Sequence, residues 1–239
     1  MEELRRNHDA RAAARDAEME ELRRNHDARA DAWITGVSSG VHGGTWPGEQ
    51  RSRILKWLRE NECPWDAATC AQAAKGGHLD ILQWARENGC PWDEETCAKA
   101  ADGGHLDILQ WARENGCPWN VTTCSSAAGG GHLTVLKWAR ENGCPWGPGT
   151  CAVAAMYGRL DTLEYAHEND CPWSEWTCAN AAMFGQLNTL QYAHENGCPW
   201  DEETCDVAAM CGHFDILKYA HENGCPSTAN TYALSLQLE

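Results

Sequence analysis

The chain has 239 residues, of which 19 are Lys or Arg and 35 are Asp or Glu, so its formal net charge is −16. A surface this acidic repels phosphate backbones, and no basic cluster offsets it, which excludes nucleic acid as an expected partner. No apolar run approaches the roughly 20 residues that a membrane span needs, so no membrane span is predicted.

The first 50 residues differ from the rest of the chain. The stretch MEELRRNHDARA at 1–12 returns unchanged at 19–30, an offset of 18 residues, which is five turns of an α-helix. We interpret residues 1–32 as a charged amino-terminal segment, for which a solvated or partly disordered helix and a docking or self-associating helix are the alternatives. Residues 33–50 are rich in Gly and Ser and are predicted to be a linker.

Cysteine usage bears on the cellular compartment. The chain contains 14 cysteines, and its first thirty residues hold no apolar region of the kind found in a secretion signal. Dense cysteine in a chain that is not exported indicates reduced thiols. We therefore expect a cytoplasmic, reducing location.

From residue 51 to residue 239 the sequence has a fixed period. Cysteines followed by proline recur every 27 residues, at Cys63, Cys90, Cys117, Cys144, Cys171, Cys198 and Cys225. Thr-Cys and Ala-Ala pairs recur in the same register, with no insertion across about seven units. Strict self-similarity at this length predicts a solenoid of stacked repeats, and the units contain helix patterns only, so the predicted class is all-α.

Each unit is predicted to contain two helices. The first begins after Asp93, a residue type preferred at the N-cap, and its interior is nearly all small residues. The second, HLDILQWARENG at 105–116, is apolar over most of its circumference and ends at Gly116, which suits a left-handed helix terminus. Because the first helices carry small side chains and the second carry Trp and Leu, the units are wedges. Stacked wedges should curve the array with the first helices inside.

The segment that joins two units, CPWDEETC at 90–97, allows three interpretations. With Asp93 as N-cap, Trp92 and Cys97 occupy the positions that pack together in a hydrophobic staple, and Cys90 is predicted to point into the core. A zinc site is disfavoured because paired zinc ligands usually stand two to four residues apart. A disulfide between Cys90 and Cys97 would need an oxidising compartment. We favour the structural interpretation, and therefore predict no metal ligand, no cofactor and no catalytic residue.

One unit, TCAKAADGGHLDILQWARENGC at 96–117, resembles the ankyrin repeat. The matching elements are Ala100-Ala101, the Gly104-His105 pair and the closing Gly116-Cys117. Two departures are present, since Thr-Cys-Ala replaces the Thr-Pro-Leu-His signature and the period is six residues short of the usual 33. The resemblance covers roughly 51–239 and implies a compact variant without the β-hairpin fingers. It also implies a non-catalytic scaffold that binds a protein partner, with no small-molecule substrate.

Two columns of the repeat change along the chain and are the places where specificity is expected. At the end of the first helices, Gly and charged residues give way to an apolar stripe at Met156, Tyr157, Met183, Phe184 and Met210. Such side chains suit a protein interface near the concave rim, and extra core packing is the alternative.

The second variable column switches from Arg86, Arg113 and Arg140 to His167, His194 and His221. It is interpreted as a solvated helix face, with pH sensing as the alternative. The function favoured overall is a scaffold that binds its partner through the concave repeat surface. The alternative is a structural metal-binding or thiol-redox array that uses the Cys and His columns.

Overall fold

The computed structural model describes residues 56, 57, 59–61, 65–228 and 231, and every regular element among them is a helix. The predicted amino-terminal segment at 1–32 and the linker at 33–50 lie outside these residues. The described helices form six pairs, each made of a first helix, a tight turn and a second helix. We call each pair a hairpin, and the loop that follows its second helix the return loop.

The hairpins succeed one another along the chain with the predicted period. The first helices are α3 (Ala67–Lys75), α5 (Glu94–Asp102), α7 (Val121–Gly130), α9 (Pro148–Met156), α11 (Glu175–Met183) and α13 (Glu202–Met210). The second helices are α4 (Leu79–Glu87), α6 (Leu106–Glu114), α8 (Leu133–Glu141), α10 (Leu160–Glu168), α12 (Leu187–Glu195) and α14 (Phe214–Glu222). The predicted two-helix unit is thereby confirmed.

The predicted helix starts are confirmed at the level of single hydrogen bonds. Asp93 has an extended backbone at the N-cap of α5, and its carboxylate accepts a 3.0 Å hydrogen bond from the backbone N–H of Glu95. This bond satisfies one of the amide groups that a helix start leaves without an internal partner. The same bond forms at Asp66, Asn120 and Asp201. Ser174 also occupies an N-cap, but its hydroxyl makes no capping bond.

The predicted helix ends are also confirmed by the backbone conformation. Gly116 has a φ of +83°, in the left-handed region where a side chain is strained. Asp170 stands at the equivalent place after α10 with a φ of 63°, and it is the one residue other than Gly with positive φ in the described part of the chain. Asp tolerates this conformation better than most residues.

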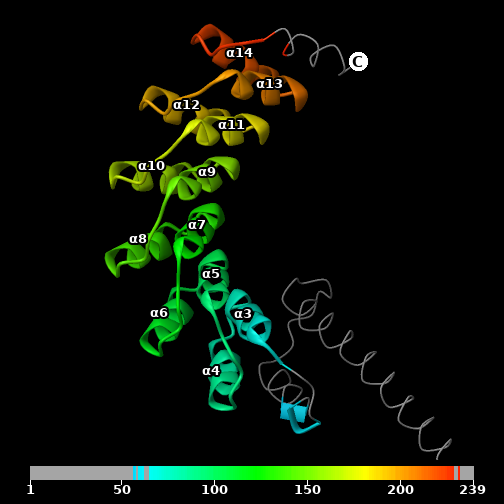
Figure 1. The fold of residues 1–239 in the computed structure, drawn as a ribbon, viewed down its shortest axis with the longest axis vertical. Helices are drawn as coiled ribbons and strands as arrows, with labels where there is room; N and C mark the ends of the chain where they lie inside the picture. The colour runs from blue at the N-terminus through cyan, green and yellow to red at the C-terminus, as the bar shows by residue number, and fades with distance from the viewer. Residues whose placement is uncertain (1–55, 58, 62–64, 229–230, 232–239) are drawn as a thin grey trace, which may run out of the picture.

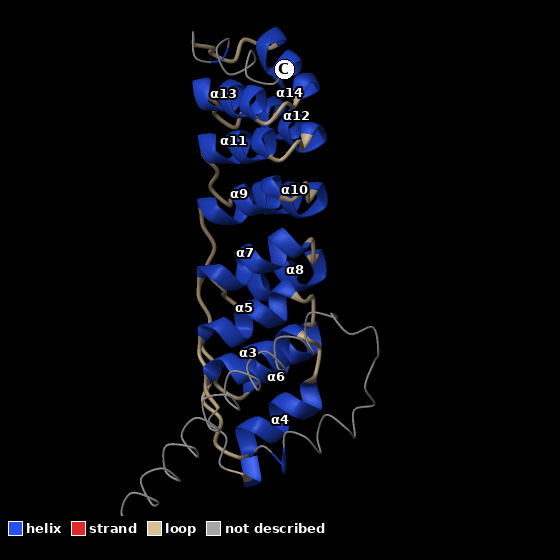
Figure 2. Ribbon diagram, turned by 90° about the vertical axis from the view of Figure 1, so that its right-hand side faces the viewer, coloured by secondary structure: helices blue, strands red, loops and turns tan. Residues whose placement is uncertain are grey.

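The hairpins stack into a curved array. Figure 1 shows the first helices along the inside of an arc and the second helices along its outside, and Figure 2 shows the hairpins lying one above another. Each first helix packs most extensively against the next first helix, where Cys97, Ala100 and Ala101 are fully buried. Second helices bury Ile108 and Leu109 but contact one another far less, so they spread apart. The predicted wedge shape and its direction of curvature are confirmed.

Candidate functional site

Buried thiol groups fasten the return loops in the described part of the chain. Cys117 is fully buried, and its Sγ lies 3.3 Å from the carbonyl oxygen of Asp93, the N-cap residue at the start of the same hairpin. The equivalent pairs, at 3.2–3.5 Å, are Cys90–Asp66, Cys144–Asn120, Cys171–Gly147, Cys198–Ser174 and Cys225–Asp201. The thiol therefore ties the end of each hairpin to its beginning, and the predicted burial of Cys90 is confirmed.

In every described hairpin the return-loop cysteine is paired with a second cysteine, which lies on the first helix. Cys97, one turn inside α5, hydrogen-bonds to Cys117, and this bond raises the pKa of Cys117 well above its usual range, with burial acting in the same direction. The partners thus stand 20 residues apart in one hairpin. The pair predicted as possible partners from the sequence, Cys90 and Cys97, instead stands within a single return loop and helix start. Every cysteine in the described ranges is a free thiol.

The tryptophan of the return loop packs against the next hairpin. The rings of Trp92 and Trp111 meet edge to face with 5.7 Å between centroids, and the guanidinium carbon of Arg86 lies over the Trp92 ring, 4.1 Å from its centroid. Trp92 also packs against the main core. These contacts hold the loop in place, whereas the predicted staple contact between Trp92 and Cys97 remains a prediction.

The column that begins with Arg86 is not simply a solvated helix face, and this part of the sequence interpretation was wrong. Arg113 stacks on Trp119 as Arg86 does on Trp92, and its Nη1 donates to the carbonyl oxygen of Cys117. His167 and His194 stack in parallel on Trp173 and Trp200, with centroids 3.7 and 3.6 Å apart. Five side chains of the column, Arg86, Arg113, Arg140, His167 and His194, clamp the return loops because each lies over an indole ring. Whether it also senses pH stays a prediction.

The histidines that precede the second helices connect neighbouring hairpins. Nε2 of His105 lies 3.0 Å from the carbonyl oxygen of Lys75, at the end of the preceding first helix. Arg159 replaces this histidine and donates from Nε to Gly129 over 3.1 Å. Since Arg supplies an equivalent donor, the contact at these positions is a structural one, whereas Gln186 in the same column donates to Phe184 of its own hairpin. The described residues contain no group of three or more His, Cys, Asp or Glu arranged for a metal ion.

The candidate binding surface is the exposed side of the first helices, which lines the inside of the arc and which we call the inner face. Its amino-terminal half, on α3 and α5, is charged. Lys75 and Asp102 form a 2.9 Å ion pair between neighbouring hairpins, and Lys99 lies 3.7 Å from Glu95. These groups largely neutralise one another, so this half presents a polar surface.

The middle of the inner face contains a shallow hollow of about 570 Å³. Its lining includes Asp102, Thr122, Ser125, Gly129, Tyr157 and Arg159. The hollow lies where Gly129 and Gly130 occupy the positions at which the next hairpin carries Met156 and Tyr157. Tyr157 stands at its border with the apolar half.

The carboxy-terminal half of the inner face is apolar. Tyr157, Phe184 and Met210 are 54%, 44% and 51% exposed, at the carboxyl ends of α9, α11 and α13. Met156 and Met183 are half-buried, and Met183 packs against the main core. The structure thus divides the predicted stripe, since its members are exposed to different degrees. We call Tyr157, Phe184 and Met210 the exposed row.

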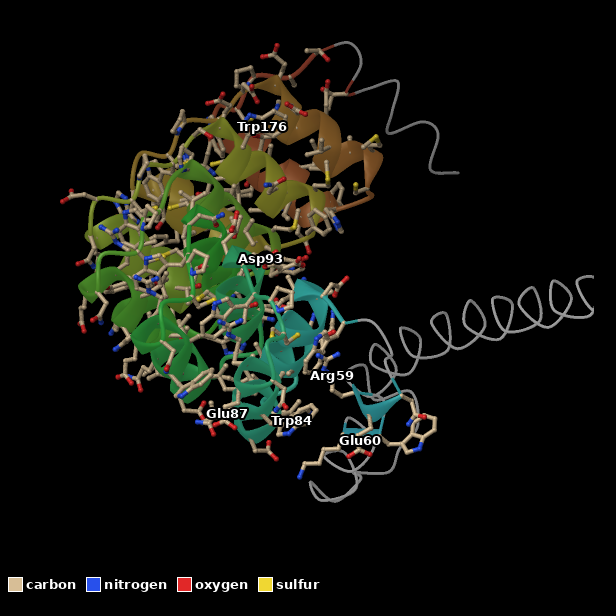
Figure 3. The ribbon with its side chains drawn as sticks, turned by 60° about the horizontal axis from the view of Figure 1, so that its bottom comes forward. Arg59, Glu60, Trp84, Glu87, Asp93 and Trp176 are labelled. Carbon is tan, nitrogen blue, oxygen red and sulfur yellow. The ribbon has the colours of Figure 1, made fainter. Side chains whose placement is uncertain are left out.

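One exposed aromatic residue on these helices was missed by the sequence analysis. Trp176 lies in the first turn of α11 and is 55% exposed (Figure 3). The equivalent position holds Glu95 and Glu203 in α5 and α13. A large apolar residue in place of a glutamate was the signal available in the sequence. Trp176, Asn180 and Met183 follow a spacing that places them on one side of α11.

Comparison with known proteins supports the architecture. No protein-family model matches the chain, and no curated protein sequence matches it. Among solved structures, the chain is similar to the human ASB11 ankyrin repeat domain, with a TM-score of 0.52 and 16% sequence identity. The match covers 71% of this chain and 97% of that domain. The fold is therefore that of an ankyrin-like repeat array, as the sequence resemblance implied.

No helix in the described ranges has both the length and the apolar composition that crossing a bilayer requires.

Proposed function

We propose that this ankyrin-like repeat protein is a non-catalytic scaffold that binds a protein partner along its inner face. The observation that carries the proposal is the exposed row, Tyr157, Phe184 and Met210, which places an exposed apolar side chain at the carboxyl end of each of three successive first helices. Exposed apolar side chains that recur on one side of a protein cost hydration free energy unless a partner covers them. A stacked array offers such a row to an extended or helical segment of another protein.

The character of the partner follows from the same surface. Aromatic and methionine side chains contribute strongly to protein interfaces because they bury a large area and adapt to different shapes. We propose that the partner places apolar side chains on the exposed row and on Trp176, and polar groups along α5 and in the hollow. The net charge of −16 favours partners with a neutral or basic surface over acidic ones.

The repeat region, which the sequence delimits as 51–239, is proposed to act without catalysis in a cytoplasmic location. An active site needs an asymmetric set of reactive groups in one pocket. Most of the Cys and His residues in the described ranges instead recur as structural equivalents, in the contacts that close and join the hairpins. Protein binding is therefore proposed in preference to an enzymatic role.

The test is a comparison of partner capture by three forms of the full chain. The variant Tyr157→Ser, Phe184→Ser, Met210→Ser removes the exposed row, and we expect it to weaken capture on the order of tenfold or more, as for the central residues of an interface. Its melting temperature should stay within about 2 °C of the parent, because exposed positions contribute little to stability. Val121→Ser is the control, since Val121 is 47% exposed but lies on α7 outside the row.

Two results would overturn the proposal. Capture of the same proteins by the triple variant and the parent would show that the row binds nothing. A melting temperature lowered as far as by a core substitution would show that these side chains serve packing instead.

Trp176→Glu gives a second, independent test of the same surface. It installs the residue that α5 and α13 carry at this position, so the helix start is preserved. We expect weaker capture at unchanged stability, by a smaller factor than for the triple variant. Equal capture by this variant and the parent would remove Trp176 from the interface.

A further inference from the structure

The hairpin of α13 and α14 contains a thiol pair in a different setting from the others. The paired thiols of the earlier hairpins, such as Cys124 and Cys144, belong to the continuous main core. Cys205 and Cys225 instead form a small separate cluster with Ala220. Sγ of Cys225 lies 3.2 Å from the carbonyl oxygen of Asp201, which holds it beside the first turn of α13 and thus beside Cys205.

The covering of this pair also differs. Each earlier return loop in the described chain carries a tryptophan two residues after its cysteine. The indole ring of that tryptophan packs against the main core. The loop after α14 carries Ser227 at this position. A hollow of about 320 Å³ lies there, lined by Cys205, Phe214, Leu217, His221, Ser227 and Thr231. Cys225 keeps 5% exposure, against 3% for Cys171 and Cys198 and none for Cys117 and Cys144, while Cys205 is reached only through the hollow that it lines.

From this placement we propose that Cys205 and Cys225 are a modification site, a dithiol that a low-molecular-weight disulfide oxidises to an intramolecular disulfide. The two residues are held together by the fold before any reaction. The hollow beside Ser227 gives a small reagent a route that the tryptophans close in the earlier hairpins.

The chemistry requires one thiolate at a time. A hydrogen bond from Cys225 lowers the pKa of Cys205, and the same bond raises the pKa of Cys225. The Cys205 thiolate attacks one sulfur of the reagent, whose S–S bond breaks and whose other half leaves as a thiolate that takes up a proton. Cys225 then loses its proton and attacks the Cys205 sulfur of the mixed disulfide, which releases the second half of the reagent. Two protein thiols lose two electrons and two protons, and the reagent gains them as two thiols.

The experiment uses the full chain with Cys211→Ser, because Cys211 is an exposed thiol that would react first. The protein is incubated with oxidised glutathione, the remaining thiols are alkylated at intervals, and linked peptides are identified by mass spectrometry. We expect the Cys205–Cys225 peptide pair to form on the order of tenfold faster than Cys124–Cys144, since the latter requires a local opening of the stack.

Ser227→Trp is the matched variant, because it restores the residue of the earlier return loops. It should slow formation of the Cys205–Cys225 link towards the rate of Cys124–Cys144. In a Cys225→Ser variant, Cys205 should stop at the mixed disulfide with glutathione. Circular dichroism of each variant confirms that it is folded.

Three outcomes would overturn the proposal. One is the absence of a Cys205–Cys225 link in the parent, and another is its formation no faster than that of Cys124–Cys144. The third is a folded Ser227→Trp variant that is oxidised as fast as the parent. The first two use the parent chain alone, so the proposal remains testable if the tryptophan variant does not fold.

Discussion

The hairpins of α3–α8 and those of α9–α14 share one backbone arrangement but close it with different side chains. In the earlier hairpins an arginine stacks on the return-loop tryptophan and donates to the cysteine carbonyl, as Arg113 does to Cys117. The equivalent contact after α10 and α12 is a parallel stack of His167 or His194 on the indole ring. The ring that meets the indole edge-on also changes, from Trp111 against Trp92 to Tyr165 against Trp146 and Tyr219 against Trp200.

This difference shows which contacts the repeat requires and which it can exchange. The buried thiols, the paired alanines and the leucine of the second helix are the same in both regions, because a stacked core admits one side-chain volume at each place. The side chain that stacks on the return-loop tryptophan lies at the surface, where volume is less restricted. Either a guanidinium group or an imidazole ring can therefore occupy this place. The side chains of the inner face vary most along the array. They change from ion pairs on α3 and α5 to the exposed row on α9, α11 and α13.

The largest expected effect tests whether the two regions have equivalent cores. Leu109 and Leu190 are both fully buried at the same place in α6 and α12. Leu109→Ala and Leu190→Ala should each lower the free energy of unfolding by about 3 kcal/mol, from lost burial and the cavity left behind. Urea denaturation measures both, and a difference well above about 1 kcal/mol would show that the cores are not equivalent.

A smaller effect is expected from the clamps, where the regions differ. Arg113→Ala removes a stacking interaction and a hydrogen bond to a backbone carbonyl, and should cost about 1.5 kcal/mol. His194→Ala removes a stacking interaction and should cost about 0.5 kcal/mol. The same denaturation experiment compares them. If both substitutions cost the same, the hydrogen bond of the arginine adds no stability.

The smallest expected effect concerns the helix end at Asp170. Asp170→Gly should raise the free energy of unfolding by about 0.5 kcal/mol, because Gly adopts the left-handed conformation without strain. Gly143→Asp, the reverse change after α8, should lower it by a similar amount. Thermal melts of the two variants give the comparison, and a loss of stability in Asp170→Gly would contradict the assignment of strain to this residue.

Much of the fold was predictable because its signals are local. The N-cap at Asp93, the helix end at Gly116 and the tolerated exception at Asp170 depend on residues within one helical turn. Because the same residue types recur every 27 residues, a helix start or end predicted in one unit is also predicted in the others. The curvature of the array also followed, because it depends on side-chain size, which the sequence states directly.

The candidate site was predictable in part. The change from Gly129-Gly130 to Met156-Tyr157, Met183-Phe184 and Met210-Cys211 was visible in the repeat, and the structure adds that Tyr157, Phe184 and Met210 are exposed while Met183 packs against the core. Trp176 was not among the predicted site residues, because the prediction rested on the variable positions at the ends of the first helices and Trp176 lies in a first turn.

What the sequence by itself determined is the repeat, the two helices of each unit and the residues that begin and end them. The tertiary structure alone decided that Cys97 meets Cys117, that Arg86 covers Trp92 and that His105 reaches the carbonyl of Lys75. The last of these pairs spans 30 residues. The physical reason is that helix starts and ends depend on bonds between near neighbours, whereas these contacts exist only once a hairpin has folded back and the next one has packed against it.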